Sequence, residues 1–132
     1  MRFVLDTHAA LWAQVDAKRL SAKVRAALAG LPPADLAVSD VSLTEAARLL
    51  FDGRLTPVNG APGAWLERFA LCYTVLPVAP RIAWAAASFA WSHRDPCDRH
   101  IVATALVQGL PLVTIDPVMT AFAPTVGVTV VW

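Results

Sequence analysis

Five short runs of mostly apolar residues constrain the fold of this 132-residue chain more than any other feature. Continuous runs, as opposed to alternating patterns, are typical of strands buried on both faces of a sheet. We expect strands at Phe3–Leu5, Leu36–Val38, Tyr73–Leu76, Leu112–Ile115 and Val128–Val131. Between them we expect helices at Ala9–Trp12, Ser21–Ala29, Ser42–Asp52, Ala61–Ala70, Arg81–Trp91 and Pro96–Gln108. This alternation predicts an α/β fold, a three-layer α/β/α sandwich with a central, mainly parallel five-stranded sheet.

The length of the chain suits one hydrophobic core, and we expect residues 1–132 to form a single domain. Because 57% of the residues are hydrophobic, a membrane location has to be considered. The longest stretches without Asp, Glu, Lys or Arg are His100–Ile115 and Pro117–Trp132, and Pro and Gly interrupt both. Each is shorter than the roughly 20 residues that a bilayer crossing needs, so we predict no membrane span.

The N-terminus reaches Asp6 before any apolar run of a signal peptide could form, which predicts a cytoplasmic protein. A net charge of +1 excludes the broad basic field that coats nucleic acid without specificity. The two cysteines, Cys72 and Cys97, are too few for a disulfide framework or a four-ligand zinc site. We therefore interpret them as free, buried thiols.

Acidic residues stand at the ends of several predicted elements. Asp6 follows the first strand and Asp116 follows the fourth, while Glu45 opens the third helix and Asp98 opens the last long one. In an open parallel sheet, ligands bind outside the carboxyl ends of the strands, where the strand order reverses. If the first and fourth strands are neighbours at that point, all four acids converge on one crevice.

Several carboxylates held close together repel one another unless a cation is present. Oxygen ligands suit a hard ion, Mg²⁺ or Mn²⁺. Such an ion activates water and stabilises charge on a phosphodiester, which is the chemistry of hydrolytic nucleases. The sequence contains no nucleophile elbow, Walker loop or glycine-rich dinucleotide turn.

Each acid also has a structural interpretation. The segment from Ser42 to Glu45 matches a capping box, in which the Glu side chain binds the backbone at a helix start. Asp95 and Pro96 are typical of a helix N-cap followed by its first residue, and we favour that capping role for Asp95. Asp116 with Pro117 fits an ordinary turn.

Four ordered motifs carry a family resemblance that covers essentially the whole chain. They are Leu5-Asp6-Thr7-His8, Ser42-Leu43-Thr44-Glu45, Asp95-Pro96-Cys97-Asp98-Arg99 continuing into Ile101–Ala105, and Thr114-Ile115-Asp116. Together they resemble the motif set of PIN-domain proteins, in particular the VapC toxins of VapBC toxin–antitoxin modules. The resemblance implies a metal-dependent endoribonuclease built on a parallel sheet.

The family's acidic positions fall on Asp6, Glu45, Asp98 and Asp116, which the resemblance implies as the catalytic, metal-binding residues. It implies Asp6 and Asp98 as the strongest ligands of Mg²⁺ or Mn²⁺, Asp116 as a supporting ligand, and Glu45 as a ligand or a group that orients the attacking water. The hydroxyls that we expect to support these acids belong to Thr7, Ser42 and Thr114. We expect His8 and Arg99 to be exposed or salt-bridged, and His93 and His100 to be structural or exposed.

The resemblance also implies an RNA substrate, a cognate VapB-type antitoxin and a homodimer. The predicted helix at Arg81–Trp91 carries apolar residues on two sides, with Trp84 and Trp91 opposite Ile82 and Phe89. A helix of this kind needs a second element or partner to cover it. We expect Trp84, Trp91 and, beside the first acid, Trp12 to contact the second subunit or the antitoxin.

Four other classes of protein fit parts of the pattern. A PIN-type RNA-processing nuclease that is not a toxin has the same acids. A Mg²⁺-binding signalling module normally needs a late lysine, whereas the only lysines here are Lys18 and Lys23. A haloacid-dehalogenase-like phosphatase needs an acid two residues after Asp6, where this chain has His8. A noncatalytic interaction domain has no need of four converging acids.

Overall fold

A computed structural model describes residues 1–132 and contains one five-stranded parallel sheet. The strands are β1 (Phe3–Leu5), β2 (Leu36–Ser39), β3 (Thr74–Leu76), β4 (Leu112–Val113) and β5 (Val130–Val131). Their order is β3-β2-β1-β4-β5, and every neighbouring pair is parallel. All five predicted strands are confirmed, although β4 and β5 are shorter than their apolar runs.

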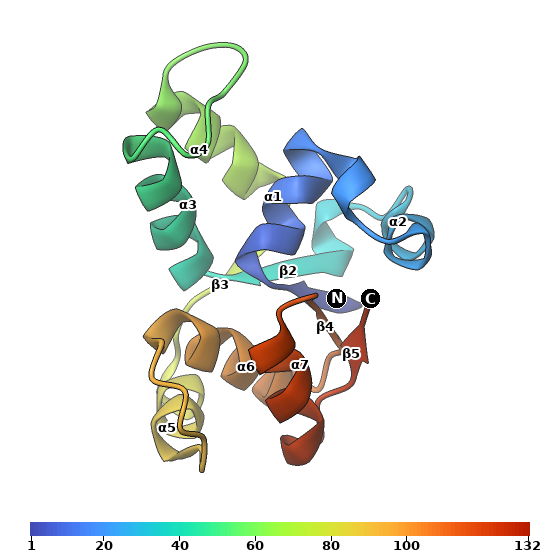
Figure 1. The fold of residues 1–132 in the computed structure, drawn as a ribbon, viewed down its shortest axis with the longest axis vertical. Helices are drawn as coiled ribbons and strands as arrows, with labels where there is room; N and C mark the ends of the chain where they lie inside the picture. The colour runs from blue at the N-terminus through green and yellow to red at the C-terminus, as the bar shows by residue number, and fades with distance from the viewer.

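Helices cover both faces of the sheet, as predicted for a three-layer sandwich (Figure 1). One layer contains α1 (Thr7–Val15), α2 (Ala22–Leu28), α3 (Val41–Phe51) and α4 (Pro62–Leu71). The other contains α5 (Pro80–Ser88), α6 (Pro96–Gln108) and α7 (Pro117–Phe122). None of these helices has the length and apolar character that a membrane crossing requires.

The alternation of side chains along the strands divides the core between the two layers. Leu5 and Val38 belong to the cluster that contains Ala10 of α1. Their neighbours Val4 and Ala37 belong to the cluster formed with α6 and α7. Because successive strand residues point to opposite faces, an apolar run without polar interruptions buries both faces of the sheet.

The strand order reverses between β1 and β4, which places the ends of these strands together. The chain adds β2 and β3 on one side of β1 and then returns to add β4 and β5 on the other. Leu5 pairs with Val113, so Asp6 and Thr114 are the next residues along two adjacent strands. The first and fourth strands are therefore neighbours where the strand order reverses, as the predicted convergence of the acids required.

The apolar helix predicted at Arg81–Trp91 ends earlier, at Ser88. The Arg99 side chain binds the carbonyl oxygens of Ala86 and Phe89 at 2.8 and 3.0 Å, and Phe89 already has non-helical dihedral angles. Trp91 lies beyond the helix and stacks on Phe122 at 4.2 Å between ring centroids. The prediction that Trp91 shares a helix face with Trp84 is therefore wrong. Trp84 is 74% exposed and is the one of the two that presents an apolar side chain to solvent.

The alternative interpretation of Asp116 and Pro117 as an ordinary turn is wrong, because α7 begins there. The Asp116 carboxylate accepts hydrogen bonds from the backbone amides of Val118 and Met119, at 2.8 and 3.0 Å, and Pro117 occupies the first helical position. These are the features of a helix N-terminus. Cys72 and Cys97 are free thiols, as predicted, and both are partly buried.

Candidate active site

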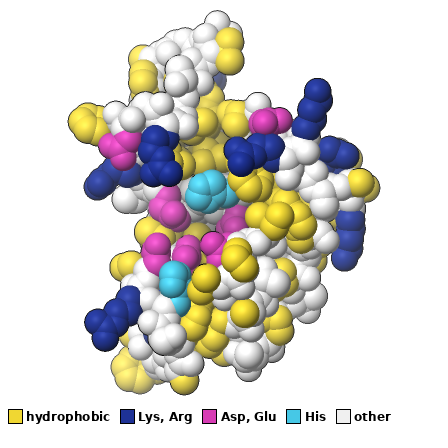
Figure 2. All heavy atoms as spheres, viewed as in Figure 1, with side chains coloured by type: hydrophobic (Ala, Val, Ile, Leu, Met, Phe, Trp, Pro, Cys, Tyr) yellow, Lys and Arg dark blue, Asp and Glu magenta, His cyan; other side chains and the backbone are white.

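The four predicted acids line one cavity of about 170 Å³ at the carboxyl ends of the strands. We call it the acidic cavity, and its lining residues are Asp6, Thr7, His8, Glu45, Asp95, Asp98, Ile101, Asp116 and Met119. Figure 2 shows acidic side chains gathered in a hollow across the middle of this face, between the two helical layers. The sequence prediction that these acids converge is confirmed.

Asp6 is the most buried acid of the cavity, with 3% of its surface exposed. One carboxylate oxygen accepts a hydrogen bond from the Ala9 backbone amide at 2.6 Å, which caps α1. This cap explains why the helix begins at Thr7 and not at Ala9 as predicted. The other oxygen accepts from the hydroxyl of Thr114, whose oxygen in turn accepts from the Asp116 amide at 3.0 Å. Thr114 thus joins the two acids that follow β1 and β4.

Glu45 lies on α3 and points across the cleft to α1. Its carboxylate is 2.6 Å from the Thr7 hydroxyl, which is also 2.9 Å from the hydroxyl of Ser42. The capping box is wrong, because α3 begins at Val41 and Ser42 is fully buried inside the helix. Thr7, Ser42 and Thr114 are buried near the acids, as the sequence predicted for supporting hydroxyls.

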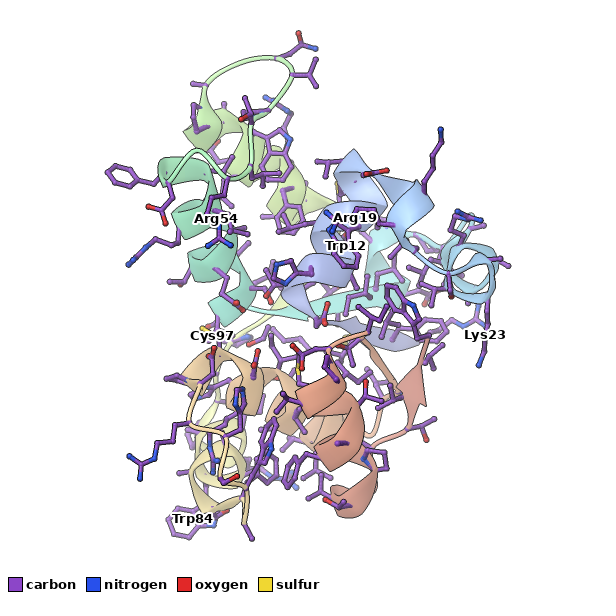
Figure 3. All side chains as sticks on the ribbon, in the orientation of Figure 1. Trp12, Arg19, Lys23, Arg54, Trp84 and Cys97 are labelled. Carbon is purple, nitrogen blue, oxygen red and sulfur yellow. The ribbon has the colours of Figure 1, made fainter.

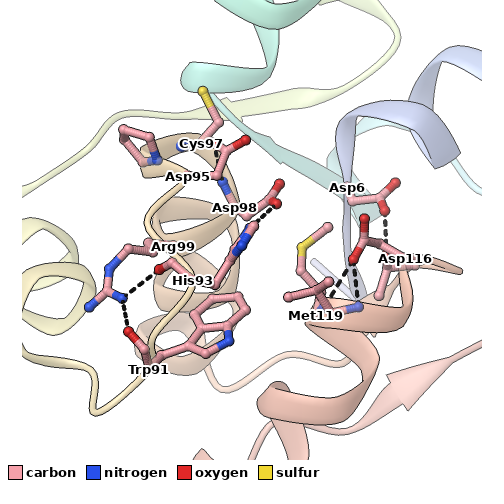
Figure 4. Close-up of polar contacts among 12 residues, drawn as sticks. Asp6, Trp91, His93, Asp95, Cys97, Asp98, Arg99, Asp116 and Met119 are labelled. Atoms are coloured by element: carbon pink, nitrogen blue, oxygen red, sulfur yellow. Dashed lines mark hydrogen bonds and ion pairs between the residues drawn. The ribbon is translucent and has the colours of Figure 1, made fainter.

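Asp98 has a partner that sequence reasoning missed. A carboxylate oxygen of Asp98 is 2.6 Å from Nε2 of His93, five residues earlier in the chain (Figure 4). His93, Asp95 and Asp98 each offer a ligating atom, and these atoms lie within 4.8 Å of one another. The expectation of a structural or exposed His93 did not include this contact, which arises because the segment before α6 folds back over the start of that helix. Helical spacing describes only neighbours within the helix and gives no indication of this contact.

Arg99 holds that segment in place. Its guanidinium donates to the backbone carbonyls of Ala86, Phe89, Trp91 and His93 at distances between 2.8 and 3.0 Å. Figure 4 shows the contacts with Trp91 and His93. The prediction that Arg99 is exposed or salt-bridged is wrong, since it pairs with no carboxylate and its donors are consumed by the main chain. His8 is exposed, as predicted, and packs against Trp12 at 5.8 Å between ring centroids.

Asp95 performs the capping role that we favoured. It is exposed, and one carboxylate oxygen accepts from the amides of Cys97 and Asp98 at 2.9 and 3.4 Å. Its place in the lining of the cavity shows that capping does not remove it from the site. Asp116 likewise combines a cap with a place at the cavity.

Burial and crowding disfavour the charged forms of these acids. Burial raises the pKa of Asp6 above its usual range, against the opposing hydrogen bonds from Thr114 and Ala9. Burial likewise raises the pKa of Glu45 and of Asp98, and the neighbouring acids raise it further. The hydrogen bond from Thr7 opposes this rise at Glu45, and the contact with His93 opposes it at Asp98. Burial, helped by the charges of Glu45, Asp95 and Asp98, raises the pKa of Cys97 to about 11. A raised pKa disfavours the thiolate, which is the nucleophilic form of cysteine.

Comparison with known proteins identifies the family. The sequence model of the PIN domain family, described as "PIN domain", matches residues 3–123. The chain belongs to the PIN domain family. This PIN domain is 36% identical over 118 residues to the Mycobacterium tuberculosis protein named Ribonuclease VapC22, covering 86% of this chain and 85% of the relative. That match confirms the resemblance to VapC toxins noted in the sequence.

Solved structures share the fold of this PIN domain. A chain in the structure of DNA-bound VapBC from Salmonella typhimurium matches with a TM-score of 0.71 and 20% identity, covering 99% of this chain and 97% of that one. A chain in the structure of VapBC-1 from nontypeable Haemophilus influenzae matches with a TM-score of 0.72 and 15% identity, covering 99% and 97%. These likenesses confirm the predicted PIN-like fold.

The PIN domain family implies a divalent cation, and the donors of the acidic cavity fit one. Asp6, Glu45, Asp98 and Asp116 offer only oxygen atoms, and the structure has no Lys or Arg within ion-pair distance of any of them. Burial, together with the neighbouring acids, raises the pKa of the first three and so disfavours their charged forms. A hard cation supplies the missing positive charge.

Proposed function

We propose that the protein is a Mg²⁺- or Mn²⁺-dependent endoribonuclease that acts in the cytoplasm as the toxin of a toxin–antitoxin module. The observation that carries this proposal is the meeting of four acids, from four separate parts of the chain, in one cavity at the switch point of the sheet. The name of the relative, Ribonuclease VapC22, supports the same activity.

In this function Asp6, Glu45, Asp98 and Asp116 hold the ion, with Asp95 at the rim as a further oxygen donor. A bound divalent cation supplies charge stabilisation at the phosphodiester and lowers the pKa of a bound water. Hydrolysis forms one P–O bond from water and breaks one P–O ester bond, leaving a hydroxyl and a phosphate monoester.

The hydrogen bonds of the chain fix the orientation of these acids. Thr114 donates to Asp6, Thr7 donates to Glu45, and His93 lies against Asp98. A hydrogen bond that favours the charged carboxylate opposes the effect of burial and keeps the acid available as an anion. Met119 and Ile101 are buried and contribute apolar side chains to the lining of the cavity.

The proposed partners are a VapB-type antitoxin and a second copy of the chain. Solved structures with this fold include VapBC complexes and one described as a toxin–antitoxin complex from Klebsiella pneumoniae. The apolar surface at Trp84 and the partly exposed Trp12 are candidate contacts. A monodisperse monomer that does not associate with the product of the neighbouring gene would contradict this part of the proposal.

The first test is RNA cleavage by the double variant Asp6→Asn, Asp98→Asn. We expect the wild type to cleave RNA in Mg²⁺ or Mn²⁺ and to lose activity in EDTA. The double variant should lose activity by roughly three orders of magnitude or more, since removing even one electrostatic contributor costs about 10²–10³ in kcat. Its circular dichroism should match the wild type, because Asn caps a helix as well as Asp. Retained, EDTA-resistant cleavage by the double variant would overturn the mechanism.

A further inference from the structure

A second cavity, of about 330 Å³, adjoins the acidic cavity and contains arginine. We call it the arginine cavity, and its polar lining residues are His8, Thr44, Glu45, Arg48, Arg54 and Cys97. Two of these, His8 and Glu45, also line the acidic cavity and so form the boundary between the two. A molecule bound at the four acids therefore has a direct route into a pocket of opposite charge.

The α3 helix places Arg48 in this cavity. Arg48 follows Glu45 by three residues and Thr44 by four, and residues with this spacing lie on one face of a helix. The face that presents Glu45 to the acidic cavity therefore presents Arg48 one turn further on. Thr44 and Arg48 are both exposed to solvent.

The end of α3 turns the chain so that Arg54 comes back beside the same helix. Gly53 has a φ of +71°, and its amide donates to the Leu50 carbonyl at 3.2 Å. The Arg54 amide donates to the Leu49 carbonyl at 2.9 Å. This pair of hydrogen bonds is a Schellman motif, which requires the left-handed conformation that glycine adopts readily. Figure 3 shows Arg54 beside α3 and Cys97 at the start of α6, and both residues line the cavity.

Neither arginine has a partner within the chain. The structure contains no ion pair and no side-chain hydrogen bond of Arg48 or Arg54. In contrast, Arg99 uses its donors on backbone carbonyls. Two unpaired guanidinium groups at one cavity provide the planar, bidentate donors that suit a phosphate oxygen pair.

We propose that the arginine cavity binds a phosphodiester of the RNA strand that neighbours the phosphodiester held at the four acids. The proposal rests on the proposed ribonuclease function and deepens it by assigning the direction in which the strand leaves the site. Glu45, at the boundary, disfavours an anion on its own side and so separates the metal-binding position from the phosphate-binding position. The strand then crosses α3 over Thr44 and Arg48 toward Arg54.

The test compares Arg48→Gln, Arg54→Gln with the control Arg2→Gln, Arg81→Gln. Arg2 and Arg81 are exposed and line neither cavity, and their replacement removes the same two positive charges. Both pairs are introduced into an Asp98→Asn background, and binding of a short fluorescein-labelled single-stranded RNA of mixed sequence is measured by anisotropy over a series of salt concentrations. The same pairs in the otherwise wild-type chain give kcat and KM for cleavage.

For the arginine cavity variant we expect the slope of log K against log salt to become shallower by about 0.7, because the cavity neutralises one phosphate and each single-stranded phosphate contributes about 0.7. We expect RNA binding about tenfold weaker, and a raised KM with kcat nearly unchanged, since this contact is equal in ground and transition states. The control pair should retain the slope of the parent. The exposed positions of all four arginines predict unchanged melting temperatures.

A slope and KM equal to those of the control would overturn the proposal and leave the ribonuclease function standing. Loss of antitoxin binding with unchanged RNA binding would also overturn it, by assigning the cavity to an acidic side chain of the antitoxin. A wild type that cleaves no RNA would instead refute the proposed function itself. The two failures are therefore distinguishable.

Discussion

The two walls of the acidic cavity hold their acids by different means. On the wall formed by α1, α3 and the strand ends, Asp6 and Glu45 accept hydrogen bonds from Thr114 and Thr7, two hydroxyls that are at most 2% exposed. On the wall formed by α6, Asp98 contacts His93, whose side chain is 27% exposed and belongs to an irregular segment. The first wall therefore depends on the packing of the sheet and helices.

The second wall depends mainly on the side chain of Arg99. The segment that carries His93 runs from the end of α5 to the start of α6, and Arg99 binds its carbonyls at Phe89, Trp91 and His93. Packing also contributes, because Trp91 stacks on Phe122. An acid can therefore have a fixed orientation without burial of its partner, provided that the partner's main chain is held. For this reason we expect the two walls to respond differently to mutation.

The largest effect is expected from Arg99→Gln, which removes the group that binds four carbonyls. We expect the free energy of unfolding to fall by about 2–4 kcal/mol, because carbonyls that lose a charged donor are left unsatisfied. Arg99→Lys should not restore it, since an ammonium group lacks the planar fork of donors. The measurement is urea denaturation followed by circular dichroism.

The matched control for that experiment is Arg94→Gln, an exposed arginine in the same segment without a side-chain hydrogen bond. It should change stability by no more than about 0.5 kcal/mol. If Arg99→Gln were as stable as this control, the segment would be held by Trp91 and Phe122 alone, and the described difference between the two walls would disappear.

A smaller effect is expected when the hydrogen-bond partner of one acid is replaced on either wall. His93→Phe should weaken Mn²⁺ binding about tenfold, as expected when a hydrogen bond to a ligating group is lost, with little change in stability. His93→Gln should recover part of that affinity, because its amide can donate to Asp98. Thr7→Val should weaken Mn²⁺ binding and also lower stability by about 1–3 kcal/mol, because it leaves buried polar groups unpaired.

Mn²⁺ affinity from electron paramagnetic resonance and stability from thermal denaturation give the two readouts. The comparison of the walls fails if His93→Phe costs as much stability as Thr7→Val, or if His93→Phe leaves Mn²⁺ affinity unchanged. Because neither readout requires RNA cleavage, the result does not depend on the substrate.

The parts of the site that the sequence predicted are those that follow directly from strand and helix order. Asp6 and Asp116 come directly after apolar runs, and the sheet brings the ends of parallel strands together whatever the loops do. Asp98 shares a face of its helix with Ile101, Val102 and Ala105, and this periodicity already directs it toward the sheet. These relations are local or topological, so a single sequence contains them.

The parts that were missed depend on a segment that turns back on the chain. The contact of His93 with Asp98, the binding of carbonyls by Arg99 and the stacking of Trp91 on Phe122 all arise where α5 ends early. No periodicity marks such a segment, because its geometry follows from a tertiary contact and not from local propensity. The start of α7 was different, since Asp116 and Pro117 repeat the helix-start pattern of Asp95 and Pro96 and were open to the same interpretation.

The smallest expected effect concerns the pH dependence of stability in EDTA, and it compares Asp6 with Asp98. Burial raises the pKa of both carboxyls in the folded chain. Asp6, on the first wall, is the more buried of the two, so we expect the larger effect there. In the window above the unfolded pKa of about 3.9, the folded state retains protons that the unfolded chain has released. Stability from these groups is therefore greatest at the acidic end of the window and is lost as pH rises through the folded pKa values.

Asp6→Asn removes this dependence, so the melting temperature of the variant should gain on that of the wild type as pH rises toward 7, and Asp98→Asn should gain less. Mg²⁺ should reverse the ranking at pH 7 by stabilising the wild type most. A gain for Asp98→Asn larger than that for Asp6→Asn would place the greater cost of ionisation on the second wall and would contradict the comparison.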